Sequence, residues 1–109
     1  MVPPIRDQGW CGSCWAFAAS GAIEISTLIS DPQHYTQSNI HVSEQQQVDC
    51  VTTSYGCEGG WSEDSFKYAA ARGITSGQSY QYTGSTGNCR RHGGEFRIYD
   101  YEHYKMTCQ

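Results

Sequence analysis

Hydrophobic residues after position 13 recur at the three- and four-residue steps of an α-helix. Trp15, Ala18 and Ala22 begin the series, and Ile25 and Ile29 continue it. Further apolar residues fill much of the remaining helix surface: Phe17, Ala19, Ile23 and Leu28. This pattern predicts a long helix that opens at Ser13 and is apolar on nearly every side. A helix of that kind belongs inside a domain and not on its surface.

Two shorter helices are predicted further along the chain. The run Ser43-Glu-Gln-Gln46 has the form of a capping box, in which the two side chains satisfy each other's backbone N–H groups, so a helix should open at Ser43. Another should begin near Ser62 with acidic residues in its first turn and stop at Gly73. Its buried stripe is expected to be Phe66, Ala69 and Ala70, and one short strand is expected where Phe96 and Ile98 alternate with Glu95, Arg97 and Tyr99.

Composition narrows the class of protein. The 109 residues are 38% hydrophobic and 13% aromatic, which suits one folded domain or a piece of a larger one. A net charge of −4 with 7 basic residues argues against nucleic acid or an anionic membrane as partner. The apolar run from Trp15 to Ile23 is too short to span a bilayer. Six cysteines in this length are typical of an oxidising compartment.

The segment around Cys14 carries the candidate chemistry. Cys14 falls in the first turn of the long helix, with Ser13 as its predicted N-cap. Backbone N–H groups at a helix start favour a thiolate over a thiol. The small residues Gly12 and Ser13 would let a substrate backbone approach the sulfur, and the amide of Gln8 could donate a hydrogen bond to a developing oxyanion.

Three interpretations of the Cys11-x-x-Cys14 spacing compete. A zinc site would need a second closely spaced pair, which the cysteines at positions 50, 57, 89 and 108 do not offer. A thioredoxin-like dithiol-disulfide oxidoreductase using Cys11 and Cys14 fits the local Trp-Cys-Gly-Ser-Cys run, but only ten residues precede Cys11 where a βαβ unit is needed. The third interpretation is a thiol nucleophile beside a structural cysteine.

A family resemblance supports the third interpretation. Cys11-Gly-Ser-Cys-Trp15 resembles the C-G-[SA]-C-[WY] signature of the papain-like cysteine peptidases, the papain and cathepsin group, peptidase C1. Other segments resemble that family in its order and approximate spacing: Asp7-Gln-Gly9, Ser43-Glu-Gln45, Val48-Asp-Cys50, Ser54-Tyr-Gly-Cys57, Gly59-Gly60 and Tyr80-Gln-Tyr82. The resemblance extends over nearly all of residues 2–92.

The resemblance implies an α+β, papain-like fold. Residues 1–109 would be a partial catalytic domain of this peptidase family: the left, mostly helical half with its long central helix, without the right β-domain. It also implies a cysteine-type endopeptidase that hydrolyses peptide bonds through an acyl-enzyme on Cys14. The catalytic His and Asn, which the family places roughly 130–150 residues after the nucleophile, would be absent from this stretch, so the fragment alone should be inactive.

The same resemblance implies roles for individual residues. Cys14 corresponds to the nucleophile and Gln8 to the oxyanion-hole glutamine. Substrate-binding positions would be Gly12, Ser13, Tyr55, Gly59, Gly60 and Trp61. The family pattern pairs Cys11 with Cys57 and Cys50 with Cys89, and leaves Cys108 over.

Partners and location follow from the resemblance too. Peptide and protein substrates, the missing C-terminal β-domain, and a propeptide or cystatin-type inhibitors are the implied partners. No metal and no organic cofactor are expected. A lysosomal or extracellular location is inferred from the cysteine content together with the family.

Overall fold

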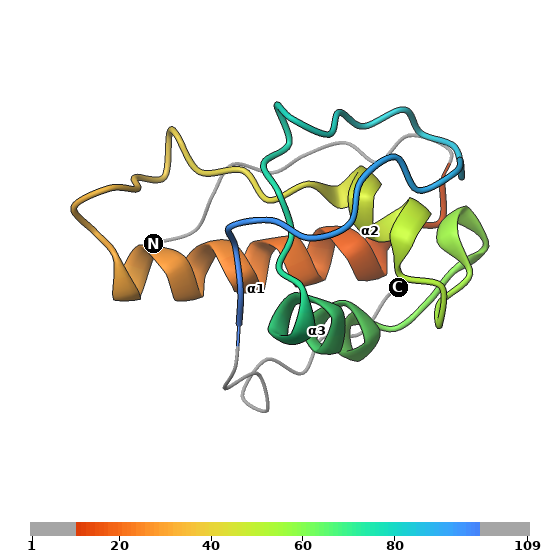
Figure 1. Ribbon diagram of the computed structural model, residues 1–109, viewed down its shortest axis with the longest axis horizontal. Helices are drawn as coiled ribbons and strands as arrows, with labels where there is room; N and C mark the ends of the chain where they lie inside the picture. The colour runs from red at the N-terminus through yellow and green to blue at the C-terminus, as the bar shows by residue number, and fades with distance from the viewer. Residues whose placement is uncertain (1–10, 99–109) are drawn as a thin grey trace.

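The three predicted helices are present and pack together (Figure 1). The computed structural model describes residues 11–98. Within them α1 spans Cys14–Ser30, α2 spans Glu44–Cys50, α3 spans Ser62–Ala71, and a short 3-10 helix, η1, covers Gly56–Glu58. Both α2 and α3 pack against α1, on opposite sides of it in the view of Figure 1. The domain is therefore built around its long helix, as expected.

The core lies between α1 and the elements packed against it and consists of two clusters. The first turn contributes Trp15 and Ala16, which pack with Val48 of α2 and with Val51, the residue that follows α2. The larger cluster joins the rest of α1 to α3 and to the loops: Ala19, Ala22, Ile23, Leu28, Ile40, Val42, Phe66, Ala69, Ile74, Phe96 and Ile98. The core thus holds the first turn of α1 in place as firmly as its middle.

The expectation that α1 is enclosed on nearly every side is wrong for one of its faces. Ala18 and Ile25 are only half-buried, and Ile29 is 65% exposed. These three residues follow one another along a single helix face because they lie seven and four positions apart. An apolar pattern around a helix predicts which residues favour burial. It does not show which other segment packs over them.

The N-terminus of α2 forms half of the predicted capping box. The Ser43 hydroxyl accepts a hydrogen bond from Gln46 N–H at 3.0 Å, as a capping serine does. The Gln46 side chain does not return the bond, because Ser43 N–H donates to the carbonyl of Thr75 instead. Gln46 Oε1 accepts from Thr75 N–H at 2.7 Å, and its Nε2 donates to the carbonyls of Arg91 and Gly93.

The two neighbouring glutamines of α2 are also buried and make tertiary bonds. Gln45 donates to the carbonyl of Ser85 at 2.9 Å and accepts from Thr83 N–H at 2.8 Å. Gln47 donates to the Ser20 hydroxyl of α1 at 2.6 Å. Together the three amides tie α2 to α1 and to the loops after α3.

The short strand expected at Phe96 and Ile98 does not form within the described residues. Both residues are buried and Arg97 is exposed, so the predicted alternation is correct. Only Phe96 pairs, in an isolated antiparallel bridge with Ile74. The pairing does not lengthen because the N–H groups that would continue it are bonded elsewhere: Arg72 N–H to the Tyr68 carbonyl and Gly94 N–H to the Arg72 carbonyl.

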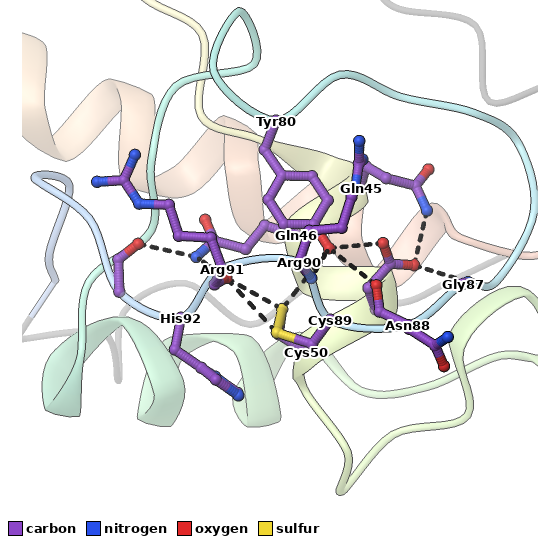
Figure 2. Close-up of a disulfide and its surroundings, with 12 residues drawn as sticks. Gln45, Gln46, Cys50, Tyr80, Gly87, Asn88, Cys89, Arg90, Arg91 and His92 are labelled. Atoms are coloured by element: carbon purple, nitrogen blue, oxygen red, sulfur yellow. Dashed lines mark hydrogen bonds between the residues drawn. A yellow bond between two sulfur atoms is a disulfide. The ribbon is translucent and has the colours of Figure 1, made fainter.

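A disulfide closes the loop after α3 onto the end of α2 (Figure 2). Cys50 is bonded to Cys89, as the family pattern implied. Beside it the buried Tyr80 hydroxyl donates to Asp49 Oδ2 at 2.7 Å and accepts from Arg90 N–H at 3.0 Å. The Arg90 guanidinium lies 4.1 Å from the centre of the Tyr80 ring. Burial, reinforced by the nearby Asp49 carboxylate, raises the pKa of Tyr80 above its usual value.

The chain contains no helix, within the part that the structure describes, that could cross a membrane.

Replacing Gln46 by leucine should destabilise the domain by about 2–4 kcal/mol, because the buried Thr75 N–H and the part-buried carbonyls of Arg91 and Gly93 lose their partner. Equilibrium unfolding in urea would measure the change. Gln78→Leu is the matched control, since Gln78 is exposed and its change should stay within about 0.5 kcal/mol. Equal losses in the two variants would contradict the assigned role of Gln46.

Tyr80 should make the domain less stable at alkaline pH. Because its pKa is raised in the folded state, the folded chain keeps a proton that the unfolded chain releases above about pH 10. The unfolding free energy should therefore fall as the pH rises above that value. Denaturation curves between pH 8 and pH 11 (roughly the range that spans a tyrosine pKa) would show a shallower decline in Tyr80→Phe than in Tyr55→Phe, whose ring is exposed.

Candidate functional site

The turn that precedes α1 lies directly against the segment around η1. Cys11 is buried and disulfide-bonded to Cys57, with 4.6 Å between their Cα atoms. The next residue, Gly12, donates its N–H to the Cys57 carbonyl at 2.8 Å. A Cβ atom at Gly12 would lie 2.6 Å from that carbonyl oxygen and 3.8 Å from Gly59 N. The two backbones can therefore meet only where residue 12 has no side chain.

Ser13 and Cys14 begin α1 at this contact. Ser13 occupies the N-cap position as predicted, but its side chain does not cap the helix. Its buried hydroxyl instead forms a 3.0 Å hydrogen bond with the Tyr82 hydroxyl. The Tyr82 ring packs edge-on against Phe17, with 5.2 Å between the ring centres. Tyr82 thus holds the first turn of α1 from the side, and Cys14, half-buried, is the first helical residue.

Trp15 connects this first turn to the start of η1 and to the start of α3. Its indole N–H donates to the Gly56 carbonyl at 3.0 Å, and its carbonyl accepts from the Ser62 hydroxyl at 3.0 Å. A Cβ atom at Gly60 would lie 2.8 Å from the Trp15 ring and 2.6 Å from the Ser54 side chain. Gly60 is therefore required for close packing of this loop on α1.

The loop from Tyr55 to Trp61 exposes one large aromatic residue at each end. Tyr55 is 70% and Trp61 69% exposed. Tyr55 N–H donates to the Gly59 carbonyl at 2.8 Å, which closes the loop. Ser54 Oγ accepts from Trp61 N–H and donates to Asp64 of α3. Gly59 has a φ of +119°, with no atom within 4 Å of where its Cβ would be, so the backbone here is accessible.

The structure therefore brings most of the predicted site residues together. The segment that holds Gly59 and Gly60 lies beside Gly12 and Trp15, and so beside the turn that leads to Cys14. Gln8, the expected oxyanion-hole residue, lies outside the described residues, as does Cys108. The two predicted disulfides, Cys11–Cys57 and Cys50–Cys89, are both present.

The thioredoxin-like alternative is wrong. A dithiol site needs Cys11 and Cys14 to bond reversibly to each other, whereas Cys11 is bonded to Cys57. Cys14 is itself in the disulfide-bonded state, and no cysteine among residues 11–98 has a free thiol. Any nucleophilic chemistry at Cys14 therefore begins with reduction of its sulfur.

One group of side chains in the described part of the chain has the spacing of metal ligands. It comprises Cys50, Cys89 and His92, whose ligand atoms lie within 4.8 Å of one another. The two sulfurs are joined in a disulfide, so neither is a thiolate able to coordinate a metal.

The role of Tyr82 was not predicted from the sequence. The segment Tyr80-Gln-Tyr82 contributed to the family resemblance, but nothing in its local pattern indicated a contact with Ser13. The two residues lie 69 positions apart, and a pairing over that distance leaves no periodic signal in one sequence. The contact between the Tyr82 hydroxyl and the buried Ser13 can be recognised only in the folded chain.

Sequence comparison finds one family. The model described as papain family cysteine protease matches residues 1–109. Zingipain-1 of Zingiber officinale is 47% identical over 90 residues, which cover 81% of this chain and 38% of that protein. Cathepsin L 2 of Paramecium tetraurelia is 42% identical over 90 residues, which cover 81% of this chain and 27% of that protein. The chain thus spans well under half the length of these relatives.

Solved structures give the same result. Digestive procathepsin L2 from the larval midgut of Tenebrio molitor superposes with a TM-score of 0.76 and 46% identity, covering 83% of this chain and 28% of that one. The proform of the ragweed pollen cysteine protease Amb a 11 gives a TM-score of 0.72 and 42% identity, covering 83% of this chain and 27% of that one. The fold described above is accordingly that of the left, helical domain of these proteins.

Gly12→Ala should disrupt the contact between the turn and η1. The added methyl group would meet the Cys57 carbonyl at 2.6 Å, so the variant should lose about 1–3 kcal/mol of stability. Urea unfolding of the oxidised chain would measure it.

Gly21→Ala is the control for the same substitution in a different environment. Gly21 lies within α1, and nothing is within 4 Å of its would-be Cβ. Alanine there should stabilise the helix by about 0.5–1 kcal/mol. A Gly12→Ala variant as stable as Gly21→Ala would show that the two backbones do not meet as described.

Proposed function

Because this chain belongs to the papain family of cysteine proteases, we propose that it is the nucleophile-bearing half of a cysteine endopeptidase, with Cys14 as the nucleophile. One observation carries the proposal: Cys14 is the first residue of a helix whose preceding turn is bonded to a glycine-containing loop. A sulfur in that position lies at the positive end of the helix dipole. It also lies next to accessible backbone with which a peptide could pair.

Catalysis requires Cys14 as a thiolate, so reduction of its disulfide is the first step. The thiolate then attacks the carbonyl carbon of a peptide bond, and the amine leaves after it has received a proton. Water hydrolyses the resulting thioester and regenerates the thiol. The N-terminus of α1 contributes by stabilising the negative charge on the sulfur before the attack.

Two hydrogen-bond donors would stabilise the oxyanion that forms during the attack. The first is the backbone N–H of Cys14, which belongs to the first turn of α1, where N–H groups have no acceptor within the helix. The second is the side-chain amide of Gln8, from the family resemblance. Because Ser13 is buried and bonded to Tyr82, the backbone of this turn is held rigidly. Such a donor is aligned before the reaction begins.

The loop from Tyr55 to Trp61 is the proposed substrate-binding edge. By the family resemblance Gly60, the second glycine of the loop, pairs with the main chain of an extended peptide; the backbone N–H and carbonyl of Gly59 are already bonded to Gly56 and Tyr55. The exposed rings of Tyr55 and Trp61 would contact substrate side chains on either side of it. Their exposure supports this role, because large aromatic residues with so little packing are unusual in a structural position.

The second half of the site would come from the β-domain that the family carries after this one. That domain supplies the histidine that receives and delivers the proton and the asparagine that orients it. The half-exposed and exposed apolar face of α1 at Ala18, Ile25 and Ile29 supports such a neighbour, because this face would then be covered.

A propeptide and inhibitors of the cystatin type are proposed as further partners. The solved relatives include proteins in precursor form, which supports synthesis of this protein as a zymogen. With two disulfides in the described domain, the proposed location is lysosomal or extracellular.

The test joins this chain to the C-terminal half of zingipain-1 and measures hydrolysis of a fluorogenic peptide amide with a thiol reductant present. The fusion should be active and the 109-residue chain alone inactive, because a thiol without its imidazole partner lacks both activation and proton delivery. Cys14→Ser in the fusion should lower kcat by about 10⁴-fold or more.

The Gly21→Ala fusion is the control and should retain full activity. Iodoacetamide with mass spectrometry provides a second readout: after limited reduction, Cys14 should be alkylated at a lower pH than a free cysteine, whose pKa is about 8.5. Cleavage that persists in Cys14→Ser, or that the 109 residues perform by themselves, would refute the proposal.

A further inference from the structure

A cavity beside α3 has no part in the proposed peptidase site. It has a volume of about 360 Å³ and lies between α3, the loop that follows α2, and His92. We refer to it as the α3 cavity. It is lined by Cys50, Val51, Thr52, Thr53, Asp64, Lys67, Tyr68, Arg72 and His92. None of these residues is among the predicted substrate-binding positions.

Bonds between separate segments keep the walls of the α3 cavity together. The disulfide from Cys50 to Cys89 ties the end of α2 to the segment that carries His92. The Tyr68 hydroxyl of α3 is bonded to His92 Nδ1 at 2.9 Å and accepts from Gly93 N–H at 3.3 Å. Figure 2 shows His92 extending from this segment next to the disulfide. The cavity is therefore built by the tertiary fold and does not depend on one flexible loop.

The charges around the α3 cavity differ from those of the chain as a whole. The chain carries a net charge of −4, whereas the lining of the cavity contains two cations, Lys67 and Arg72, and one acid, Asp64. Within the described residues neither side chain has an ion-pair partner. Such unpaired cations are available to an anion.

The remaining polar groups are suited to an oxyanion. Thr52 and Thr53 bring hydroxyl groups and His92 brings an imidazole to the same cavity, so hydrogen-bond donors accompany the two positive charges. Phosphate and sulfate groups are recognised by this combination of cations and neutral donors. The volume of about 360 Å³ falls in the range of small-molecule sites, which is roughly 300–1,000 Å³. The cavity therefore has room for a small molecule to which a phosphate or sulfate group is attached.

We propose that the α3 cavity binds the phosphate or sulfate group of a small molecule between Lys67 and Arg72. Asp64 is the one acid in its lining, and its carboxylate accepts a hydrogen bond from Ser54 at 2.7 Å. Arg72 lies eight positions after Asp64, about 12 Å along a helix axis, whereas Lys67 lies only three positions after it, within one helical turn. Arg72 is therefore the cation farther from this carboxylate, and Asp64 offsets part of the charge of Lys67.

The binding test uses the oxidised 109-residue chain, labelled with ¹⁵N, and follows its amide resonances. Sodium phosphate, sodium sulfate and glucose 6-phosphate are titrated separately at constant ionic strength, with sodium chloride and glucose as blanks. The expected result is saturable shifts at Thr52, Thr53 and His92 with phosphate or sulfate, and binding of glucose 6-phosphate at least as tight. Glucose and chloride should cause none.

Variants then separate a built site from a generally basic surface. The double variant Lys67→Gln/Arg72→Gln should bind about tenfold more weakly, because it loses both charge-assisted contacts. Arg97→Gln removes the same charge from an exposed residue outside the cavity lining and should change the affinity less than about twofold. Shifts that do not saturate, shifts confined to other residues, or an equal loss in Arg97→Gln would each overturn the proposal. Titration of the unmodified chain is enough to detect the first two of these outcomes, non-saturating shifts and shifts confined to other residues.

Discussion

The structure depends on a set of buried glutamine side chains on one short helix. After α3 the described chain contains isolated bridges and no paired strand, so the backbone N–H and C=O groups of its loops cannot satisfy one another in a sheet. A buried backbone group without a partner is costly. Gln45, Gln46 and Gln47 of α2 supply partners for the segments at positions 75, 83–85 and 91–93 and for α1. An amide side chain is suited to this role because it offers both a donor and an acceptor.

The same bonds extend to the turn that carries Cys14. Gln45 accepts a hydrogen bond from Thr83 N–H. The residue before Thr83, Tyr82, is hydrogen-bonded through its hydroxyl to Ser13. On the other side of the turn, Gly12 donates to Cys57 and Cys11 is bonded to it covalently. The start of α1 is therefore held from two directions by residues far away in the sequence. This matters for the proposed chemistry, because a preorganised donor and a fixed sulfur need no rearrangement during the reaction.

The two surfaces to which we assign functions by proposal differ in physical character. Around the start of α1 the accessible features are backbone, small residues and two aromatic rings, which suit an extended peptide. Around the α3 cavity they are cations and hydroxyl groups, which suit an anion. The exposed apolar face of α1 at Ile29 belongs to neither surface, and a neighbouring domain in the proposed complete enzyme would account for it. A single core supports all three surfaces, because Trp15 joins α1 to η1 and to the first residue of α3.

The sequence alone was sufficient for the features that depend on neighbouring residues. The three helices, the capping serine of α2 and the glycine after α3 are specified by local periodicity and by backbone rules that act over four residues or fewer. The cysteine signature and the segments around it were enough to indicate the family and the disulfides Cys11–Cys57 and Cys50–Cys89. The expectation that Cys14 is an unbonded thiol was wrong, because Cys14 is disulfide-bonded in the folded chain.

The tertiary structure alone decided where side chains find partners across the chain. Gln46 was expected to bond to Ser43 and instead satisfies three loop segments. The alternation at Phe96 predicted a strand, but only one bridge to Ile74 forms, because Arg72 N–H is bonded within the end of α3 and Gly94 N–H is bonded to the Arg72 carbonyl. The contact between Tyr82 and Ser13 likewise has no local signal. Contacts of this kind depend on the simultaneous position of several segments, and one sequence read along its length contains no record of that arrangement.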